Sequence, residues 1–419
     1  MELLISLLLV SFTLIGYYLF GKMLNPIMIF VSWSLFLLLL SMWSNIFNSD
    51  YFWATYAILI ISYIAFTLGS IFGLKFKTIK VREKVVSFKR LSRCISLLSI
   101  VVNICIFLYI MDLSKNIGFM QILLNLSAYN VIIQSGFFEG KIYYHILNIA
   151  IPLSLFIFYY LLRGMPKHKF FLVLQFIICF LPFISVRRDT LFKMIFLNLL
   201  LWYLLSIFKP AVTKFSGNLM RKVKIVLIVI TSISFMSATQ KLLNKSIEIS
   251  DMRILGIKIP EFLIDPLSYL LGSFPYLNAS VVANSASYQG FLISSLRVPY
   301  LYIQPILGGS MDLTMPFSLP FLDIGKHALL TFNTIPIQYY SLIELGLFFP
   351  VYYLFLGIVS GQSYKKFIKN QGFSETLWLV IIFSLLFWSI REYILIYLST
   401  WIMIVTVIGV SKIVLINKR

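Results

Sequence analysis

Two arginines and a lysine occur within seven residues of an otherwise apolar part of the chain, as Arg187, Arg188 and Lys193. A guanidinium group presents a planar fork of N–H donors that matches the oxygens of a phosphate. We therefore expect one of the two arginines to bind a phosphate group. The alternative is a helix-end anchor, in which the long side chains reach the membrane surface and Asp189 pairs with Lys193 at i, i+4.

Two further arginines are phosphate-binding candidates. Arg297 stands among apolar and aromatic residues, and a lone cation in such surroundings is usually paired. Its partner could be an acid of the same loop or a ligand phosphate, and the sequence leaves both open. For Arg391 the preferred interpretation is an ion pair with its neighbour Glu392.

A histidine could take a proton from an acceptor hydroxyl, because its pKa lies near neutrality. The chain has three histidines, and two of them are candidates for this role. His327 follows Asp323-Ile324-Gly325-Lys326 in a long polar segment, and His145 begins an apolar segment. A lone histidine is more often structural, so both interpretations stay open.

The cysteines predict neither a metal site nor a disulfide. Cys94, Cys105 and Cys179 all lie in apolar segments, and their spacing matches no metal-binding motif. We expect them to be packing residues, and we expect the protein to need no cofactor.

The composition excludes a water-soluble globular protein. Of the 419 residues, 60% are hydrophobic and 12% are charged, and the mean hydropathy is +0.93. The apolar segments have the length of roughly 20 residues that a helix needs to cross a bilayer, not the roughly 10-residue alternating pattern of a membrane barrel. The sequence predicts an all-α, polytopic integral membrane helical bundle.

Eleven transmembrane helices are expected, with one long extracytoplasmic loop at 241–342. We find no internal repeat and expect a single membrane domain over 1–419. A second outer loop, 113–142, is expected to carry a helix at the membrane interface, and 262–282 is expected to be re-entrant or interfacial. The predicted spans are 2–20, 25–43, 51–73, 94–112, 143–162, 170–186, 190–208, 225–240, 343–361, 376–390 and 393–411.

The orientation follows from the lysines and arginines, because loops rich in them resist translocation. They cluster in 75–93, 163–169, 209–224, 365–369 and 412–419, which fall on one side if eleven spans exist. This side is predicted to be cytoplasmic, with the amino terminus outside and the carboxyl terminus inside. The net charge of +20 is then explained by topology, and no nucleic acid partner is expected.

Several short motifs in 308–361 resemble those of bacterial oligosaccharide repeat-unit polymerases, the Wzy-type O-antigen or capsule polymerases. They are Gly308-Gly309-Ser310, Thr331-Phe332-Asn333-Thr334, Gln338-Tyr339-Tyr340, Glu344-Leu345-Gly346 and, in the following span, Gly357. The turn Ser185-Val186-Arg187-Arg188 resembles the arginine turn of that family. One departure is Ile343-Glu344-Leu345-Gly346, where the family commonly has an Asp-Phe-Gly-like step.

The resemblance implies a glycosyltransferase of the cytoplasmic (inner) membrane. It would transfer a growing glycan from an undecaprenyl-diphosphate carrier to a sugar hydroxyl of a lipid-linked repeat unit. The arginines would bind the diphosphate, and Asn333, Tyr339 and Tyr340 would bind the glycan. Membrane lipid, a chain-length regulator and a flippase are the further partners that it implies.

Two other classes share this hydropathy. A lipid-linked glycan flippase or other transporter would be expected to have repeated halves and polar residues along a path. A metal-dependent lipid-linked glycosyltransferase would need paired acids in the first outer loop, where only Asp50 is present. The polymerase is therefore the preferred hypothesis, and the flippase is the alternative.

Overall fold

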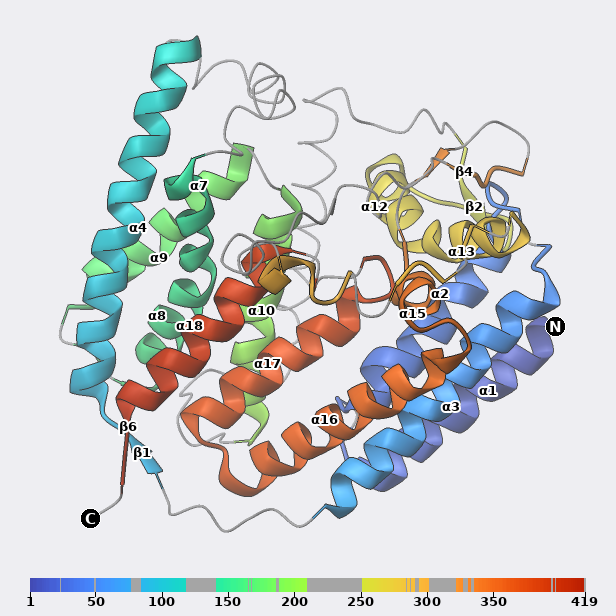
Figure 1. Cartoon of the computed structure of the whole chain (residues 1–419), viewed down its shortest axis with the longest axis horizontal. Coiled ribbons are helices and arrows are strands. Elements are labelled where there is room, and N and C mark those ends of the chain that lie inside the picture. The colour runs from blue at the N-terminus through green and yellow to red at the C-terminus, as the bar shows by residue number, and fades with distance from the viewer. Residues whose placement is uncertain are drawn as a thin grey trace. The chain divides into compact units, whose positions relative to one another are not determined.

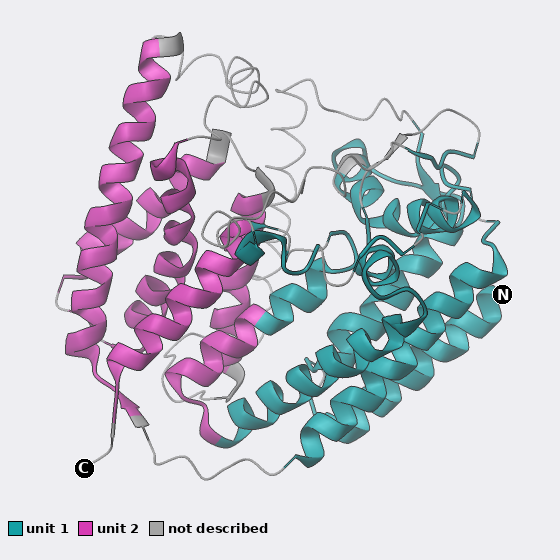
Figure 2. Cartoon of the chain, in the orientation of Figure 1, with its two compact units in different colours: residues 1–78, 248–369, 382–397 teal, residues 79–247, 370–381, 398–419 magenta. Residues whose placement is uncertain are grey.

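The computed structural model of the chain describes most of its residues. They are 1–22, 24–48, 50–76, 84–117, 141–164, 166, 168–185, 188–208, 251–283, 285–286, 288–290, 294–300, 322–326, 331–332, 335–392, 395 and 397–417. Figure 1 shows the fold, and Figure 2 shows its division into two compact units. Unit 1 comprises 1–78, 248–369 and 382–397, and unit 2 comprises 79–247, 370–381 and 398–419.

Unit 1 is built from helices of both ends of the chain, with short strands between them. Its helices are α1 (Glu2–Phe20), the π-helix η1 (Met28–Ser32), α2 (Trp33–Met42), α3 (Trp53–Lys75), α12 (Glu261–Leu271), α13 (Ser273–Val282), α15 (Ile337–Leu345), the 3-10 helix η5 (Gly346–Phe348) and α16 (Phe349–Asn370). Its strands are β2 (Arg253–Ile254), β3 (Ile257–Lys258), β4 (Leu322–Asp323) and β5 (Thr331–Phe332), paired β2–β3 and β4–β5.

Unit 2 is also helical. Its elements are β1 (Lys84–Val86), α4 (Phe88–Ile117), α7 (Ile142–Ile146), the 3-10 helix η2 (Leu147–Ile149), α8 (Ala150–Arg163), α9 (Lys169–Ser185), α10 (Arg188–Phe208), α18 (Leu398–Val414) and β6 (Leu415–Asn417). Helix α17 (Phe373–Trp388) begins in unit 2 and ends in unit 1.

The predicted spans agree with the apolar helices. Within the described residues, five helical runs are long and apolar enough to cross a membrane, and five apolar helices are shorter. Ten predicted spans fall on these helices, although the last begins at Leu398 and not at 393. The eleventh, 225–240, lies outside the described residues, as does 118–140, which holds most of the predicted interface helix. The chain is thus a predominantly helical membrane protein, while the number of spans stays a prediction.

Helices α3 and α16 pack with their backbones in close approach, side by side in Figure 1. A Cβ atom added to Gly69 or Gly73 would lie 2.1 Å from the carbonyl oxygen of Leu354 or 2.4 Å from that of Ile358. The glycines at 357 and 361 of α16 meet the backbone of α3 in the same way. Each helix therefore contributes a Gly-x-x-x-Gly pair, a pattern that brings membrane helices together.

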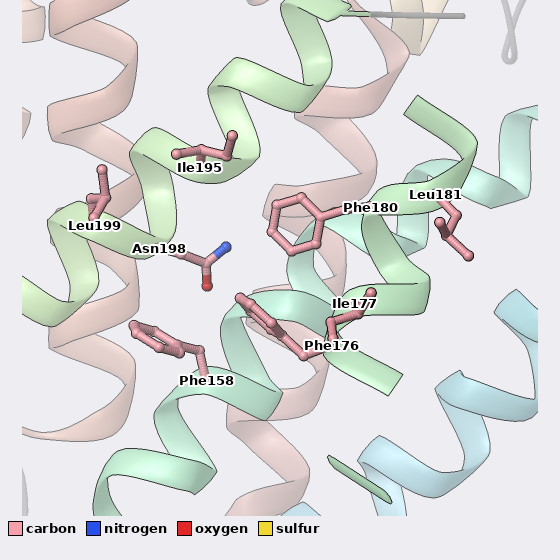
Figure 3. Close-up of a pocket in the computed structure, with 8 residues that line it drawn as sticks. All are labelled: Phe158, Phe176, Ile177, Phe180, Leu181, Ile195, Asn198 and Leu199. Atoms are coloured by element: carbon pink, nitrogen blue, oxygen red, sulfur yellow. The ribbon is translucent and has the colours of Figure 1, made fainter. Parts of the chain in front are cut away.

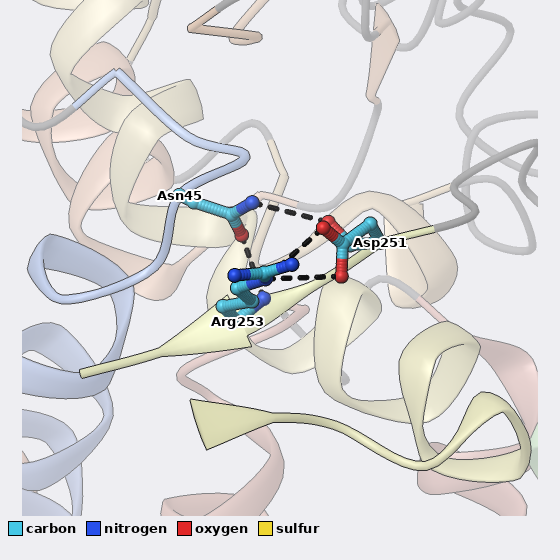
Figure 4. Close-up of polar contacts among 3 residues, drawn as sticks. All are labelled: Asn45, Asp251 and Arg253. Atoms are coloured by element: carbon cyan, nitrogen blue, oxygen red, sulfur yellow. Dashed lines mark hydrogen bonds and ion pairs between the residues drawn. The ribbon is translucent and has the colours of Figure 1, made fainter. Parts of the chain in front are cut away.

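Residues of the predicted long extracytoplasmic loop, 241–342, contact the short loop between α2 and α3. Backbone N–H groups join Asn45 to the carbonyl of Arg253 and Asn48 to the carbonyl of Ile324, at 3.1 Å each. The Asn45 amide donates to the Asp251 carbonyl at 3.1 Å and accepts from the Arg253 N–H at 2.7 Å, as Figure 4 shows. Both loops were predicted on the outer side, and their contact agrees with that grouping.

Asn278 of α13, in the same predicted loop, forms hydrogen bonds with the start of α3. Its Oδ1 accepts from the N–H of Phe52 at 2.8 Å and from the hydroxyl of Thr55 at 2.9 Å, and its Nδ2 donates to the Asp50 carbonyl at 3.2 Å. These bonds satisfy donors at a helix amino terminus, which otherwise have no partner within the helix.

Contacts among the loops predicted to be cytoplasmic also agree with their predicted placement on one side of the membrane. In unit 1, the Lys365 ammonium donates to the carbonyls of Leu74 and Phe76 at the end of α3, at 2.6 and 3.1 Å. In unit 2, β1 pairs antiparallel with β6 at the carboxyl terminus of α18. The contacts support the grouping of the loops, and the side that each group faces stays a prediction.

The segment predicted as re-entrant or interfacial forms two short helices, α12 and α13, separated at Gly272. At about 1.5 Å per residue, a helix of 10 or 11 residues is much shorter than the roughly 30 Å hydrocarbon core. Pro266 lies inside α12, and Pro275 lies in the first turn of α13. Neither helix is long enough to cross a membrane alone.

Candidate functional site

Four of the nine predicted site residues lie in the described part of unit 1: Arg297, Tyr339, Tyr340 and Arg391. His145 and Arg188 belong to unit 2, on α7 and at the start of α10. The remaining three, Arg187, His327 and Asn333, lie outside the described residues. The candidate site is therefore built from the unit 1 residues.

A buried carboxylate holds the segment that carries Arg297. Glu344, at the end of α15, is 1% exposed. Its two oxygens accept hydrogen bonds from the backbone N–H and the hydroxyl of Ser295, each at 2.5 Å. Only Leu296 separates Ser295 from Arg297, so Glu344 fixes the backbone beside this arginine. The sequence had assigned no role to Glu344.

A second connection joins the preceding residues to α15. The N–H groups of Gln289 and Gly290 both donate to the carbonyl of Ile343, at 2.7 and 3.3 Å. The carbonyl at the end of a helix is available for such bonds, because it lacks a partner within the helix. Gln289, Gly290 and Ser295 are thus all attached to the last turn of α15.

Arg297 lies half-buried beside α15, and its Nε atom is buried. Burial lowers the pKa of Arg297 relative to a free guanidinium, while the phenol of Tyr340 acts in the opposite direction. An arginine nevertheless keeps its charge throughout the physiological range. The site therefore contains a partly desolvated cation.

The two tyrosines predicted to bind glycan lie in the core of unit 1. Tyr339 and Tyr340 are 2% and 3% exposed. The ring of Tyr339 contacts those of Tyr276 and Tyr340 edge-on, with centroids 6.2 and 5.8 Å apart. Tyr340 also interacts electrostatically with Glu344 and Glu392. Both rings are therefore packed among other side chains, and glycan binding by them stays a prediction.

Arg391 does not form the ion pair with Glu392 that the sequence favoured. Its guanidinium lies over the ring of Tyr269 of α12, 5.4 Å from the centroid, a cation–π contact. Glu392 instead interacts with Tyr340. The N–H groups of both residues donate to the same carbonyl, that of Trp388, so they occupy one tight turn.

Gln338, in the first turn of α15, is a buried polar residue to which the sequence analysis assigned no role. It is 1% exposed, and neither its Oε1 nor its Nε2 has a hydrogen-bond partner among the described residues. Burying an amide without a partner is costly, so such a group often marks a ligand or water site. Its signal in the sequence was its place in the motif Gln338-Tyr339-Tyr340.

Neither candidate base can be placed at this cluster. His145 lies half-buried on α7 of unit 2, with its ring 6.0 Å from that of Tyr144. His327 is outside the described residues. Among the described residues, no group of three His, Cys, Asp or Glu side chains could hold a metal ion. Cys105 and Cys179 are buried and Cys94 is half-buried, as expected for packing residues.

Arg297, Tyr276, Tyr339, Glu344 and Glu392 all interact with Tyr340, from segments spread over more than a hundred residues, while Arg391 lies over Tyr269. A partly buried guanidinium group beside a phenol donor is suited to binding an anion. No family model, no curated protein and no solved structure matches this chain.

Proposed function

We propose that the protein polymerises lipid-linked oligosaccharide repeat units, with an undecaprenyl-diphosphate-linked glycan as donor. The observation that carries the proposal is the half-buried Arg297, held by the Glu344–Ser295 contacts beside Tyr340. These residues lie in and next to the segment whose motifs resemble the repeat-unit polymerases. Arg297, Ser295 and Tyr340 also belong to the long loop predicted to face outward, where that reaction would take place, and Glu344 lies at the start of the following predicted span.

The reaction needs two chemical functions. The bond between the anomeric carbon of the donor glycan and its diphosphate breaks, and the same carbon forms a bond to an acceptor hydroxyl oxygen. Arginine would stabilise the charge that develops on the leaving diphosphate. A base would take the proton of the acceptor hydroxyl, and His327 and His145 are the candidates for this role. Undecaprenyl diphosphate is the second product.

The test is a deletion of the gene in its own bacterium. We expect the mutant to attach single repeat units to its surface lipid, because assembly and export of the unit would continue without polymerisation. Gel separation of the extracted surface glycan measures the chain lengths. A normal length distribution would contradict polymerisation. Loss of even the single-unit product would instead favour the flippase.

A further inference from the structure

The segment that carries Arg297 is a helical turn, fixed by hydrogen bonds of its own backbone. The N–H of Arg297 donates to the carbonyl of Ser294 at 3.4 Å. The N–H of Tyr300 donates to the carbonyl of Leu296 at 2.9 Å. Within such a turn the backbone dihedrals are restricted, so the position of one residue determines those of its neighbours. A contact that holds Ser295 therefore also places the Cα atom of Arg297.

Glu344 of α15 holds Ser295 through both of its carboxylate oxygens. Its Oε1 accepts from the backbone N–H of Ser295, and its Oε2 accepts from the hydroxyl, each at 2.5 Å. Two donors that meet two oxygens form the pattern of an ionised carboxylate. The contact is buried, because Glu344 is 1% exposed and Ser295 is 6% exposed. Water therefore does not compete for these two bonds.

A buried carboxylate is a costly way to hold this segment if stability is its only purpose. Removing an ionised carboxylate from water costs free energy even when its oxygens accept hydrogen bonds. Replacing a buried charged group by an apolar side chain of similar volume is often neutral or stabilising. Stability alone is therefore a weak reason for a glutamate at 344, and placement of the residues beside Ser295 is a better one.

Arg297 meets α15 about one turn before Glu344. The guanidinium interacts with the phenol of Tyr340, which precedes Glu344 by four residues in this helix. Ser295 contacts the last turn, so the segment follows α15 from its carboxyl end back toward its amino end. The half-buried side chain of Arg297 therefore lies against a helix at a level that the Glu344–Ser295 contact sets.

A groove of about 370 Å³ between α8, α9 and α10 of unit 2 is a poor alternative site for an anion (Figure 3). Seven of its eight lining residues are apolar, and the eighth is Asn198. The Nδ2 of Asn198 already donates to the Ser154 hydroxyl and to the Met194 carbonyl, which uses both of its hydrogens. The lining therefore offers an anion neither a cation nor an unused donor, and Arg297 of unit 1 is the better candidate.

An arginine that is in place before its ligand arrives binds more tightly, because ordering a flexible side chain on binding reduces affinity. Polar contacts behind a functional side chain commonly provide this order. We propose that Glu344 is a positioning residue for Arg297: by holding Ser295, its carboxylate keeps the guanidinium in place to bind the diphosphate of the lipid-linked donor. This role rests on the proposed function, which supplies the diphosphate. Glu344 itself is buried and both of its oxygens are bonded to Ser295, so it is not placed to contact the ligand.

The test measures the binding of farnesyl diphosphate, a short prenyl diphosphate, to the full protein in lipid nanodiscs by isothermal titration calorimetry. Wild type, Glu344→Ala, Arg297→Ala and the protein with both substitutions form a double-mutant cycle. We expect each single substitution to weaken binding about tenfold, the order expected for a hydrogen bond to a charged group. The double variant should bind at most about twofold more weakly than Arg297→Ala, because Glu344 would then have no arginine to position.

Three further variants separate positioning from a general effect on the fold. Glu344→Gln keeps an acceptor for the Ser295 N–H and a donor for its hydroxyl, and should restore most of the lost affinity. Ser295→Ala removes one of the two bonds and should weaken binding by a smaller factor, and only while Arg297 is present. Ser360→Ala is the matched control, because this serine is 0% exposed and its hydroxyl bonds within α16, so it should bind like the wild type. Ser295→Ala decides the case if Glu344→Ala does not fold.

Equal weakening by Glu344→Ala with and without Arg297 would overturn the proposal, because the carboxylate would then act on the fold as a whole. Wild-type affinity in both Glu344→Ala and Ser295→Ala would also overturn it. Either result leaves the proposed function standing. A wild-type protein that binds no farnesyl diphosphate, or that binds it equally well as Arg297→Ala, would count against the proposed diphosphate site, and the positioning role would fall with it.

Discussion

At the scale of single residues, the buried Glu344 carboxylate links two parts of unit 1. It accepts from both the N–H and the hydroxyl of Ser295, and these are buried groups. Leaving a buried donor unsatisfied costs about 1–3 kcal/mol. Glu344 is therefore expected to contribute to the stability of the segment that carries Arg297, in addition to any indirect effect on ligand binding.

This contribution can be measured with two substitutions. Glu344→Ala removes both acceptors and should lower the thermal unfolding midpoint of the detergent-solubilised protein by several degrees. Glu344→Gln keeps an oxygen for the Ser295 N–H, and its amide can donate to the Ser295 hydroxyl, so it should retain most of the stability. A Glu344→Ala protein as stable as the wild type would show that the segment does not depend on this carboxylate.

The role of Arg297 in binding diphosphate depends on the shape of the guanidinium as well as its charge. If the proposed function holds, Arg297→Lys should reduce chain elongation nearly as much as Arg297→Ala, with normal protein abundance in the membrane. Arg253→Ala is the control, because this arginine is 53% exposed and pairs with Asp251. Glycan length on gels is the measurement.

If the Arg297→Ala protein elongated chains fully, Arg297 would have no role in binding diphosphate. Rescue by lysine would show that charge alone is needed. Alanine substitutions at Arg187, Arg188 and Arg391 then identify which other predicted arginine contributes.

At the scale of elements, the close contact of α3 with α16 depends on glycines, which have no Cβ atom. The glycines allow the two backbones to approach until a Cβ atom would meet a carbonyl oxygen. Such contacts form only where both helices present small residues at the same level. The same helices position the site, because α15 and η5 lead directly into α16.

Alanine at Gly73 or Gly357 should therefore destabilise the protein. The added Cβ would lie 2.4 Å from the Ile358 oxygen or 2.2 Å from the Phe66 oxygen, so the helices must separate. Overpacking of this kind costs about 1–3 kcal/mol. Gly409 of α18 is the matched control, because nothing lies within 4 Å of its added Cβ. Thermal unfolding compares the three variants, and equal midpoints for all three would contradict close packing at α3–α16.

At the scale of the whole molecule, the loops are grouped by contacts that join distant parts of the chain. The loop after α2 contacts 251–283, and the end of α3 contacts α16 near its own end. Both contacts agree with the grouping predicted from lysine and arginine positions. This agreement supports the predicted grouping of loops within each unit. Which group faces the cytoplasm has to be measured.

Cysteine labelling tests that direction. In a variant without the three native cysteines, Ile257→Cys should react with a reagent that cannot cross the membrane, because Ile257 is 70% exposed and lies in the predicted outer loop. His168→Cys, at an exposed position in a predicted cytoplasmic loop, should react only after the membrane is opened. The reverse labelling pattern would show that the predicted membrane topology is inverted.

The sequence by itself determined the class of protein and the positions of most helices. A helix satisfies its own backbone hydrogen bonds, and bilayer thickness sets its length, so a run of apolar residues is enough to predict it. Gly272 and the two prolines likewise indicated, from local chemistry alone, that 262–282 would not form one continuous helix.

Only the tertiary structure decided which side chains meet. The Glu344 carboxylate finds Ser295 at a separation of 49 residues, and Asn278 caps α3 from 226 residues away. Arg391 meets Tyr269, and not the adjacent Glu392. Tyr339 and Tyr340 are buried, although their sequence context suggested a binding surface. Hydropathy reports the tendency of a segment to enter a membrane, but the partner of a polar group depends on how helices from distant parts of the chain pack together.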